Sequence, residues 1–249
     1  MTDSSSPRPL GPPRPRCVLR VGVTGHRPGP SLPDTELHRV RSQVGTLLAD
    51  IGAAADAILK THPTLFSQET PAPVAISALA EGADRILAEE ALASGWMLDV
   101  VLPLGREEYE QDFATSESKA DFAAILTKAR AVLELQSARQ QRDRDASYEA
   151  AGFVMLDHVD ILVAVWDGQD GRGRGGTRQI MVEAARREIP VIWLRSDRDQ
   201  PLSLWHDSTP AAPLAPDASR GKDDRGPVGA LVERVTLPNR RDAAATAAM

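Results

Sequence analysis

The stretch from Asp160 to Thr177 constrains the fold of this chain more than any other. It begins with an uninterrupted apolar run, Ile161-Leu-Val-Ala-Val165, and continues into a loop with five glycines, after which a helical pattern starts at once. A strand that is apolar on both faces is typical of a parallel sheet covered by helices. A glycine-rich loop between such a strand and a helix N-terminus offers bare backbone N–H groups to a phosphate. The stretch therefore predicts an α/β fold that binds a phosphorylated ligand at one edge of its sheet.

The rest of the chain repeats this alternation of short apolar runs and segments with near-helical spacing. We predict strands at 17–23, 74–77, 97–102, 160–166 and 190–194, and helices that begin near Asp34, Gly82, Glu107, Lys119, Asp145 and Gly176. Asp34 or Thr35 is expected to cap the first helix. Strands that alternate with helices imply right-handed crossovers. The predicted fold class is α/β, a Rossmann-like three-layer sandwich with a mainly parallel sheet flanked by helices.

The chain divides into three parts by composition. Residues 1–16 form a lead-in rich in Pro, Ser and Arg, which is expected to be disordered. Residues 17–195 are expected to form one domain, which binds the phosphorylated ligand and which we interpret as nucleotide-binding. Residues 196–249 form an irregular extension rich in Pro and Ala, in which Leu231 to Leu237 is expected to form one weak strand.

Composition excludes several kinds of site. The net charge of −6 argues against a general nucleic-acid binder, which usually presents a basic face. The single cysteine, Cys17, leaves no internal disulfide and no cysteine-rich zinc site, and the five histidines are scattered. We expect no metal and no cofactor. The first 16 residues do not resemble a secretory signal and no apolar run is long enough for a membrane span, so a cytoplasmic protein without membrane contact is expected.

The end of the first strand, Val23-Thr-Gly-His-Arg27, is the first candidate binding loop. Gly25 allows a sharp turn or a close approach to a ligand. Thr24, His26 and Arg27 supply donors suited to a phosphate or a ribose. An ordinary turn with exposed polar residues fits these residues equally well, because short glycine-containing turns are weak signals.

The second candidate loop follows the next strand and runs from Ser77 to Asp84. Small residues and Gly82 clear space at a helix N-terminus. Glu81 and Asp84 lie close to that terminus, where acidic side chains commonly complement the helix dipole. The alternative is that Ser77, Glu81 and Asp84 contact a ribose or base, or that the two carboxylates act in catalysis.

The third candidate loop is the glycine-rich one. We expect Asp167, Gly168, Gly175, Gly176 and Thr177 to contact the ligand, with the last three acting as a phosphate cradle. The loop lacks the lysine of a P-loop, and it does not follow the first strand as the dinucleotide fingerprint of a Rossmann fold does.

Two charged segments between the loops stay open to either interpretation. The run Glu107-Glu-Tyr-Glu-Gln-Asp-Phe113 fits a pocket wall, or a solvated helix face with two apolar anchors. Arg144 and Tyr148 belong to a charged helix surface from which either side chain can reach inward.

Together the three loops are more specific than any one of them. Their order, with the pattern VTGHR, SALAEGADR, VLPL, DILVAVWDG and GGT, resembles the LOG and DNA-processing-protein-A superfamily, often grouped as SLOG domains. The resemblance covers roughly Leu19 to Leu194. It implies a Rossmann-like fold that binds nucleotides or nucleotide-derived ligands, and it implies a homodimer.

The chain departs from the enzymatic branch of that superfamily at one place. Enzymatic members resemble Pro-Gly-Gly-x-Gly-Thr-x-x-Glu, with acidic residues two and three positions after the threonine. Here those positions hold Gln179 and Ile180, and the loop proline is missing. The phosphate-binding half of the motif is thus retained, whereas its catalytic glutamate is not.

Three hypotheses for function follow. The first is a sensor or signalling module that binds an AMP-, ADP-ribose- or NAD-like small molecule at the carboxyl ends of the strands. The second is an N-glycoside hydrolase that releases base from a nucleotide or NAD, in which Glu81, and next Asp84, would stabilise the oxocarbenium-like charge. The third is single-stranded DNA binding, which the acidic balance and the scarce aromatic residues disfavour.

Overall fold

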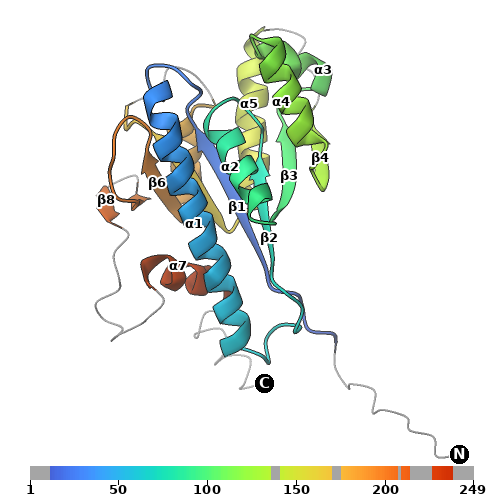
Figure 1. The fold of residues 1–249 in the computed structure, drawn as a ribbon, viewed down its shortest axis with the longest axis vertical. Helices are drawn as coiled ribbons and strands as arrows, with labels where there is room; N and C mark the ends of the chain where they lie inside the picture. Colours follow the sequence, from blue (N-terminus) through green and yellow to red (C-terminus); the bar gives the residue numbers. More distant parts are fainter. Residues whose placement is uncertain (1–11, 136–140, 170–174, 207–208, 214–225, 238–249) are drawn as a thin grey trace, which may run out of the picture.

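An eight-stranded sheet runs through the described part of the chain in this computed structural model (Figure 1). The structure describes residues 12–135, 141–169, 175–206, 209–213 and 226–237. The strands are, in chain order, β1 (Val18–Gly25), β2 (Ala72–Ser77), β3 (Met97–Leu102), β4 (Ala131–Glu134), β5 (Ile161–Trp166), β6 (Val191–Arg195), β7 (Ser203–His206) and β8 (Thr209–Pro213). Their order across the sheet is β4-β3-β2-β1-β5-β6-β7-β8. All neighbours are parallel except β6 with β7 and β7 with β8, so the sheet is mainly parallel, as predicted.

Two layers of helices cover this sheet. The helices are, in chain order, α1 (Asp34–Thr61), α2 (Ala83–Ala93), α3 (Arg106–Tyr109), the short 3-10 helix η1 (Glu110–Asp112), α4 (Ser116–Leu126), α5 (Gln141–Leu156), α6 (Thr177–Arg186) and α7 (Gly226–Thr236). Buried side chains of α1, α2, α4 and α7 form one core on one face of the sheet, and those of α5 and α6 form a second core on the other (Figure 1). The Rossmann-like three-layer arrangement predicted from the sequence is confirmed.

The position of β1 between β2 and β5 creates a crevice at the carboxyl ends of these strands. From β1 the chain builds β2, β3 and β4 to one side, and it then returns to pair β5 with the other side. Val21 of β1 therefore pairs with both Ala75 of β2 and Ile161 of β5. Where the strand order reverses in this way, a crevice opens outside the carboxyl ends of the strands, and ligands of α/β proteins bind there.

The sequence explains the main elements. All six residues of β5 are buried, because helices cover both faces of the strand. In α1, buried Val40, Val44, Leu47 and Ile51 recur at helical spacing. The expected cap is wrong, however. Pro33 stands at the cap position, no side chain caps the helix, and Asp34 lies within the first turn.

The segment from Leu231 to Leu237, predicted as a weak strand, is helical instead, since α7 runs to Thr236. Val228, Leu231 and Val232 are buried in the same core as α1, at a spacing of three and four residues. Within 231–237 alone this spacing is hidden, because the helix begins five residues earlier. Strand β7 also extends the sheet beyond residue 195, antiparallel to β6.

Strand β4 forms one edge of the sheet and stays open to solvent. Its four residues are exposed, and Val132 and Leu133 keep 43% and 46% of their surface. No helix among the described residues is long and apolar enough to cross a membrane. The lead-in up to residue 11 and the centre of the glycine-rich loop, 170–174, lie outside the described residues.

Candidate functional site

The carboxyl ends of β1, β2 and β3 and the N-terminus of α6 line a cavity of about 570 Å³. All three predicted loops contribute to its lining, as the shared sheet edge requires. The predicted site residues that line the cavity are Thr24, Gly25, His26, Arg27, Asp84, Gly175, Gly176 and Thr177. The predicted site residues that are not part of the lining are Ser77, Glu81, Gly82, Asp167 and Gly168.

The loop after β1 is held by backbone hydrogen bonds to two neighbouring elements. The N–H of His26 donates to the carbonyl of Val165 in β5 at 3.1 Å, and the N–H of Ala83 in α2 donates to the carbonyl of His26 at 3.2 Å. Gly25 permits this approach, because a Cβ atom there would lie 2.4 Å from the Cβ of Ala83. The side chain of Arg27 is exposed and makes no hydrogen bond or ion pair with the described part of the chain.

The turn after β2 contains a buried leucine in a left-handed conformation. Leu79 has φ 58°, which is costly for a side chain of this size. Its N–H donates to the Oγ of Ser77 at 3.0 Å, and its carbonyl accepts from the Nε of Arg85 at 3.1 Å. The hydroxyl of Ser77 donates in turn to the backbone carbonyl of Asp84 at 3.1 Å. Ser77 therefore stabilises the loop through these hydrogen bonds and does not line the cavity.

Asp84 is the only carboxylate among the described residues that line the cavity. Its Oδ2 accepts a hydrogen bond from the N–H of Ala78 at 3.2 Å, and its carboxylate also accepts from the amide of Ala80. Burial raises the pKa of Asp84 to about 7, because these hydrogen bonds and the nearby charge of Arg27 compensate only part of the lost hydration. At neutral pH this carboxyl group therefore exists in both the protonated and the ionised form.

Glu81, the other acidic residue of this turn, faces away from the cavity. Its carboxylate accepts a hydrogen bond from the hydroxyl of Ser118, at the start of α4. Gly82 makes this geometry possible, since it has φ 86° and a Cβ atom there would lie 2.5 Å from the carbonyl oxygen of His26. The turn thus sends Glu81 and Asp84 to opposite sides.

The end of the glycine-rich loop is held by a side chain of the helix that follows it. The N–H of Gly175 donates to the Oε1 of Gln179 at 2.7 Å, and the Nε2 of Gln179 donates to the carboxylate of Glu149 in α5. Gly175 has φ 76°, and a Cβ atom there would lie 2.9 Å from the backbone nitrogen of Glu149. Gln179 therefore ties the loop to α5. Gly176 is the cap residue of α6, and Thr177 begins the helix.

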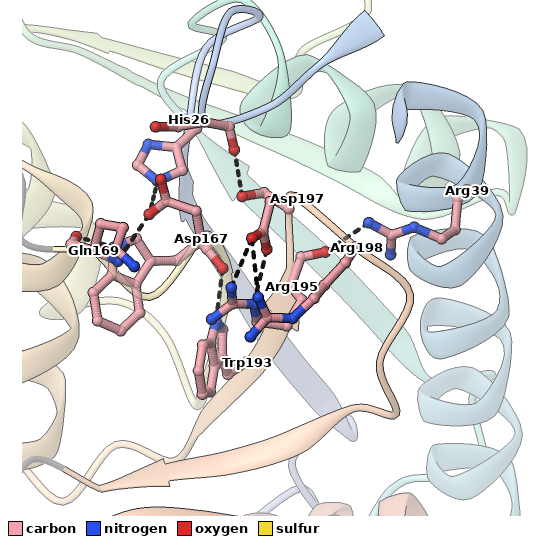
Figure 2. A network of polar contacts seen from close by, with 11 residues as sticks. His26, Arg39, Asp167, Gln169, Trp193, Arg195, Asp197 and Arg198 are labelled. Carbon is pink, nitrogen blue, oxygen red and sulfur yellow. Dashed lines mark hydrogen bonds and ion pairs between the residues drawn. The ribbon is translucent and has the colours of Figure 1, made fainter. Parts of the chain in front are cut away.

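Asp167 contacts the cavity through His26. The Nε2 of His26 lies 3.0 Å from the Oδ1 of Asp167, and the N–H of Gln169 donates to the same oxygen at 3.0 Å (Figure 2). Burial alone would raise the pKa of Asp167, but hydrogen bonds from Ser31, Gln169 and His26 outweigh it and hold the pKa below its usual value. The ionised Asp167 thus orients the His26 ring, which itself lines the cavity.

Gly168 has a packing role. It has φ 81°, and a Cβ atom there would lie 2.4 Å from an Nη atom of Arg195. Arg195 forms two hydrogen bonds of 2.8 Å with Asp197 and lies over the ring of Trp193 (Figure 2). The glycine makes room for this arginine, which belongs to the strand beside β5.

The far wall of the cavity was not assigned from the sequence. It is made mainly of apolar and aromatic side chains from the end of β3, from α3, α5 and α6: Val101, Pro103, Tyr109, Tyr148, Ala151, Gly152, Met155 and Ile180. Tyr109 and Tyr148 of this wall belong to the two charged segments between the loops, for which a position facing inward was one of two interpretations. Within 107–113, Tyr109 lines the cavity while Phe113 packs edge-on against its ring, 5.1 Å away.

Charged side chains link α5 to α3 and η1. Arg144 donates to the carboxylates of Glu108, at 2.9 Å, and Asp112. The hydroxyl of Tyr148 donates to Asp112 as well. Arg144 is thereby neutralised by two acids, and Arg27 is the cation that the cavity lining itself provides. Within the described ranges no group of three or more His, Cys, Asp or Glu side chains is placed to hold a metal ion.

Comparison with known proteins finds similarity only among solved structures. No protein-family model and no curated protein matches the chain. Among solved structures, the chain is similar to the structural-genomics target TM1055, with 14% identity, a TM-score of 0.38, and coverage of 70% of this chain and 72% of that one. It is also similar to DNA processing protein A from Streptococcus pneumoniae, with 14% identity and a TM-score of 0.43. That match covers 72% of this chain but about half the length of the other, 50%.

Proposed function

We propose that the cavity binds a nucleotide or nucleotide-derived ligand, with its phosphate at the N-terminus of α6. The observation that carries this proposal is the difference between two amide-rich loops that face the same cavity. In the first loop, the backbone N–H groups of Ala78 and Ala80 donate hydrogen bonds to the carboxylate of Asp84. In the second, the N–H of Gly175 donates to the neutral side chain of Gln179. A phosphate at the first loop would meet a carboxyl group that ionises near neutral pH. At the second loop it meets a neutral amide and the positive end of a helix dipole.

Arg27 supplies the charge that a phosphate needs. It lines the same cavity as the N-terminus of α6, from the loop after β1, and no described residue forms a hydrogen bond or ion pair with it. A guanidinium group matches phosphate oxygens geometrically, and such charge-assisted bonds are about twice as strong as neutral ones. Thr177, which is 9% exposed, adds a hydroxyl donor on the α6 side.

The apolar wall suits the remainder of such a ligand. Ala151, Met155 and Ile180 face the cavity from α5 and α6, where a flat base can bury its faces. A cavity of about 570 Å³ lies within the range of small-molecule sites, roughly 300–1,000 Å³. The combination of one polar end and one apolar wall favours an amphiphilic ligand over free phosphate.

Isothermal titration calorimetry tests the proposal with AMP, ADP-ribose, NAD and cyclic nucleotides. We expect at least one of them to bind, and Arg27→Gln to weaken that ligand about tenfold or more, because one charge-assisted bond is worth roughly 1.5–3 kcal/mol. Arg20→Gln is the matched control, since Arg20 lies on the same strand β1, near its amino end. A folded protein that binds none of these ligands contradicts the proposal.

The enzymatic alternative now depends on Asp84, since Glu81 faces Ser118. Incubation with nucleoside monophosphates or NAD, followed by chromatography, shows whether free base appears. We expect the ligand to be recovered intact, because no carboxylate follows the phosphate loop at Gln179. Base release that Asp84→Asn abolishes would replace the binding proposal with a hydrolase.

A further inference from the structure

The imidazole ring of His26 is held in place from several sides. The backbone of this residue is bonded to β5 through its N–H and to α2 through its carbonyl. Its ring is bonded through Nε2 to the Oδ1 of Asp167, 3.0 Å away (Figure 2). The turn that carries Asp167 is fixed by the indole of Trp166, which donates to the carbonyl of Gln169 at 2.8 Å. The orientation of the ring is therefore set before any ligand binds.

The second ring nitrogen of His26, Nδ1, is an unused polar atom. No described residue forms a hydrogen bond with it, and it is not one of the side-chain atoms that are sealed from solvent without a partner. The side chain keeps 20% of its surface exposed, and the residue lines the cavity together with Arg27 and the N-terminus of α6. A ligand in this cavity can therefore reach the ring.

The charge of the ring decides what Nδ1 offers to a ligand. Asp167 is ionised, because hydrogen bonds from Ser31, Gln169 and His26 hold its pKa below the usual value. A carboxylate can only accept, so the proton of a neutral ring lies on Nε2 and Nδ1 presents a bare lone pair. Such a pair is negatively charged overall and has no donor for a phosphate oxygen. A second proton, on Nδ1, makes the pair neutral and supplies that donor.

We infer that His26 takes up a proton from solvent when the phosphate of the ligand binds, and that it then donates from Nδ1 to a phosphate oxygen. Asp167 balances the charge of the ring, as the aspartate of a Ser-His-Asp triad stabilises its imidazolium. The inference rests on the proposed function. It makes His26 a phosphate contact only in its charged form, and Asp167 the residue that positions it.

The charged groups around the ring come from three neighbouring segments. Arg27, the next residue in its own loop, opposes a second positive charge in the free protein, and a bound phosphate would remove that opposition. Arg195 and Asp197, beyond Asp167, pair with each other (Figure 2). Asp84, in the first turn of α2, is the other cavity group that titrates near neutral pH, since burial raises its pKa to about 7. A test must therefore separate His26 from Asp84.

The pH dependence of affinity tests the inference, with AMP, ADP-ribose, NAD and cyclic AMP as ligands in calorimetry. His26→Gln is the informative variant, because its amide nitrogen can still donate to Asp167 but takes up no proton. We expect the ratio of wild-type to His26→Gln affinity to fall about tenfold or more as pH rises from about 6 to 9, since only the protonated ring makes a charge-assisted bond. The titration of the ligand's own phosphate, with a second pKa of about 6, cancels in this ratio.

Two further variants separate the groups. The same ratio measured in an Asp84→Asn background should fall in the same way, because that background removes the other titrating carboxyl group. Asp167→Asn should lower the affinity near pH 6, since the charged ring loses the group that balances it. Nitrogen-15 spectra of the histidine rings at about pH 7.5 give a direct measurement on wild type. Adding the ligand should move the His26 signals, identified by their loss in His26→Gln or their shift in Asp167→Asn, to the doubly protonated form.

The outcomes distinguish this inference from the proposed function. If a nucleotide binds and the affinity ratio does not change with pH, or the ring signals stay those of a neutral imidazole, the inference is wrong while nucleotide binding stands. If the ratio changes with pH in wild type but not in the Asp84→Asn background, the proton acts through Asp84 and the inference is wrong as well. If no nucleotide binds the folded protein, the proposed function fails, and the inference fails with it.

Discussion

At the scale of single residues, the cavity contains two polar groups that make the free protein less stable. Asp84 is buried with a pKa of about 7, and Tyr109 carries a buried hydroxyl without a described partner. Both would be poor choices for a core that served stability alone. Each makes a stability prediction of its own.

Asp84→Asn should change how stability depends on pH. The pKa of an aspartate carboxyl is ordinarily 3.8, and burial raises the pKa of Asp84 to about 7 in the folded protein. Between these values the folded state binds the extra proton, so the free energy of unfolding of wild type falls as pH rises, by up to about 1.4 kcal/mol for each pH unit. Above about pH 7 both states are ionised and this contribution becomes constant.

In urea unfolding at several pH values, the asparagine variant should therefore gain stability relative to wild type as pH rises from about 4 to 7, and the gain should then level off. Asparagine keeps an oxygen that can accept from Ala78. Parallel stability curves for the two proteins across this range would show that Asp84 has no raised pKa.

Tyr109→Phe should stabilise the protein without ligand. The substitution keeps the ring that packs against Phe113 and Phe122. It removes a hydroxyl that is buried without a hydrogen-bond partner among the described residues, and burying such a group costs about 1–3 kcal/mol. Tyr148→Phe should instead lower stability, because it removes the donor to Asp112. Thermal unfolding compares the two. A lower melting temperature for Tyr109→Phe would mean that the hydroxyl has a partner in the free protein.

At the scale of elements, the close contact between β1 and α2 positions two of the three loops. Gly25 lies at the end of β1 and touches the first residue of α2, and the backbone of His26 bonds to both α2 and β5. The loops can converge only because β1 contacts α2 at a residue without a side chain. The site is therefore sensitive to a single added methyl group at Gly25.

Gly25→Ala should destabilise the protein by about 1–3 kcal/mol, because the new Cβ would lie 2.4 Å from Ala83 and 2.8 Å from the carbonyl oxygen of Val165. Gly52→Ala is the matched control. Gly52 lies within α1, where a Cβ atom would meet only Trp96 Nε1, at 3.8 Å, and the change should stabilise by up to about 1 kcal/mol. Chemical denaturation measures both. Similar changes in the free energy of unfolding at the two glycines would show that the close contact between β1 and α2 does not require Gly25.

At the scale of the whole molecule, the sequence was most informative where local pattern and topology agree. The apolar run of β5 and the strand–helix alternation predicted the parallel sheet, and a parallel sheet brings the ends of β1, β2 and β5 to one edge. The meeting of Thr24, Asp84 and Thr177 around one cavity followed from that argument.

Other parts of the site depend on geometry that spacing does not reveal. Glu81 and Asp84 are three residues apart, and Glu81 was the first candidate for a catalytic role, but the positive φ of Gly82 separates them and only Asp84 lines the cavity. Tyr109 reaches the cavity from a short helix after β3, and nothing local distinguishes it from a surface anchor. Helix α7 was missed because its buried face becomes apparent only when Val228 is included.

The two edges of the sheet differ in a way that limits how copies of the chain could assemble. At one edge, β4 exposes Val132 and Leu133 and contains no proline. At the other, β8 contains Pro210 and Pro213, which have no N–H to donate to a further strand. Among the described strands, β4 is therefore better suited than β8 to pair with a strand of another copy. Such an assembly would be a two-fold pair that closes on itself, since a growing fibre needs a second competent edge.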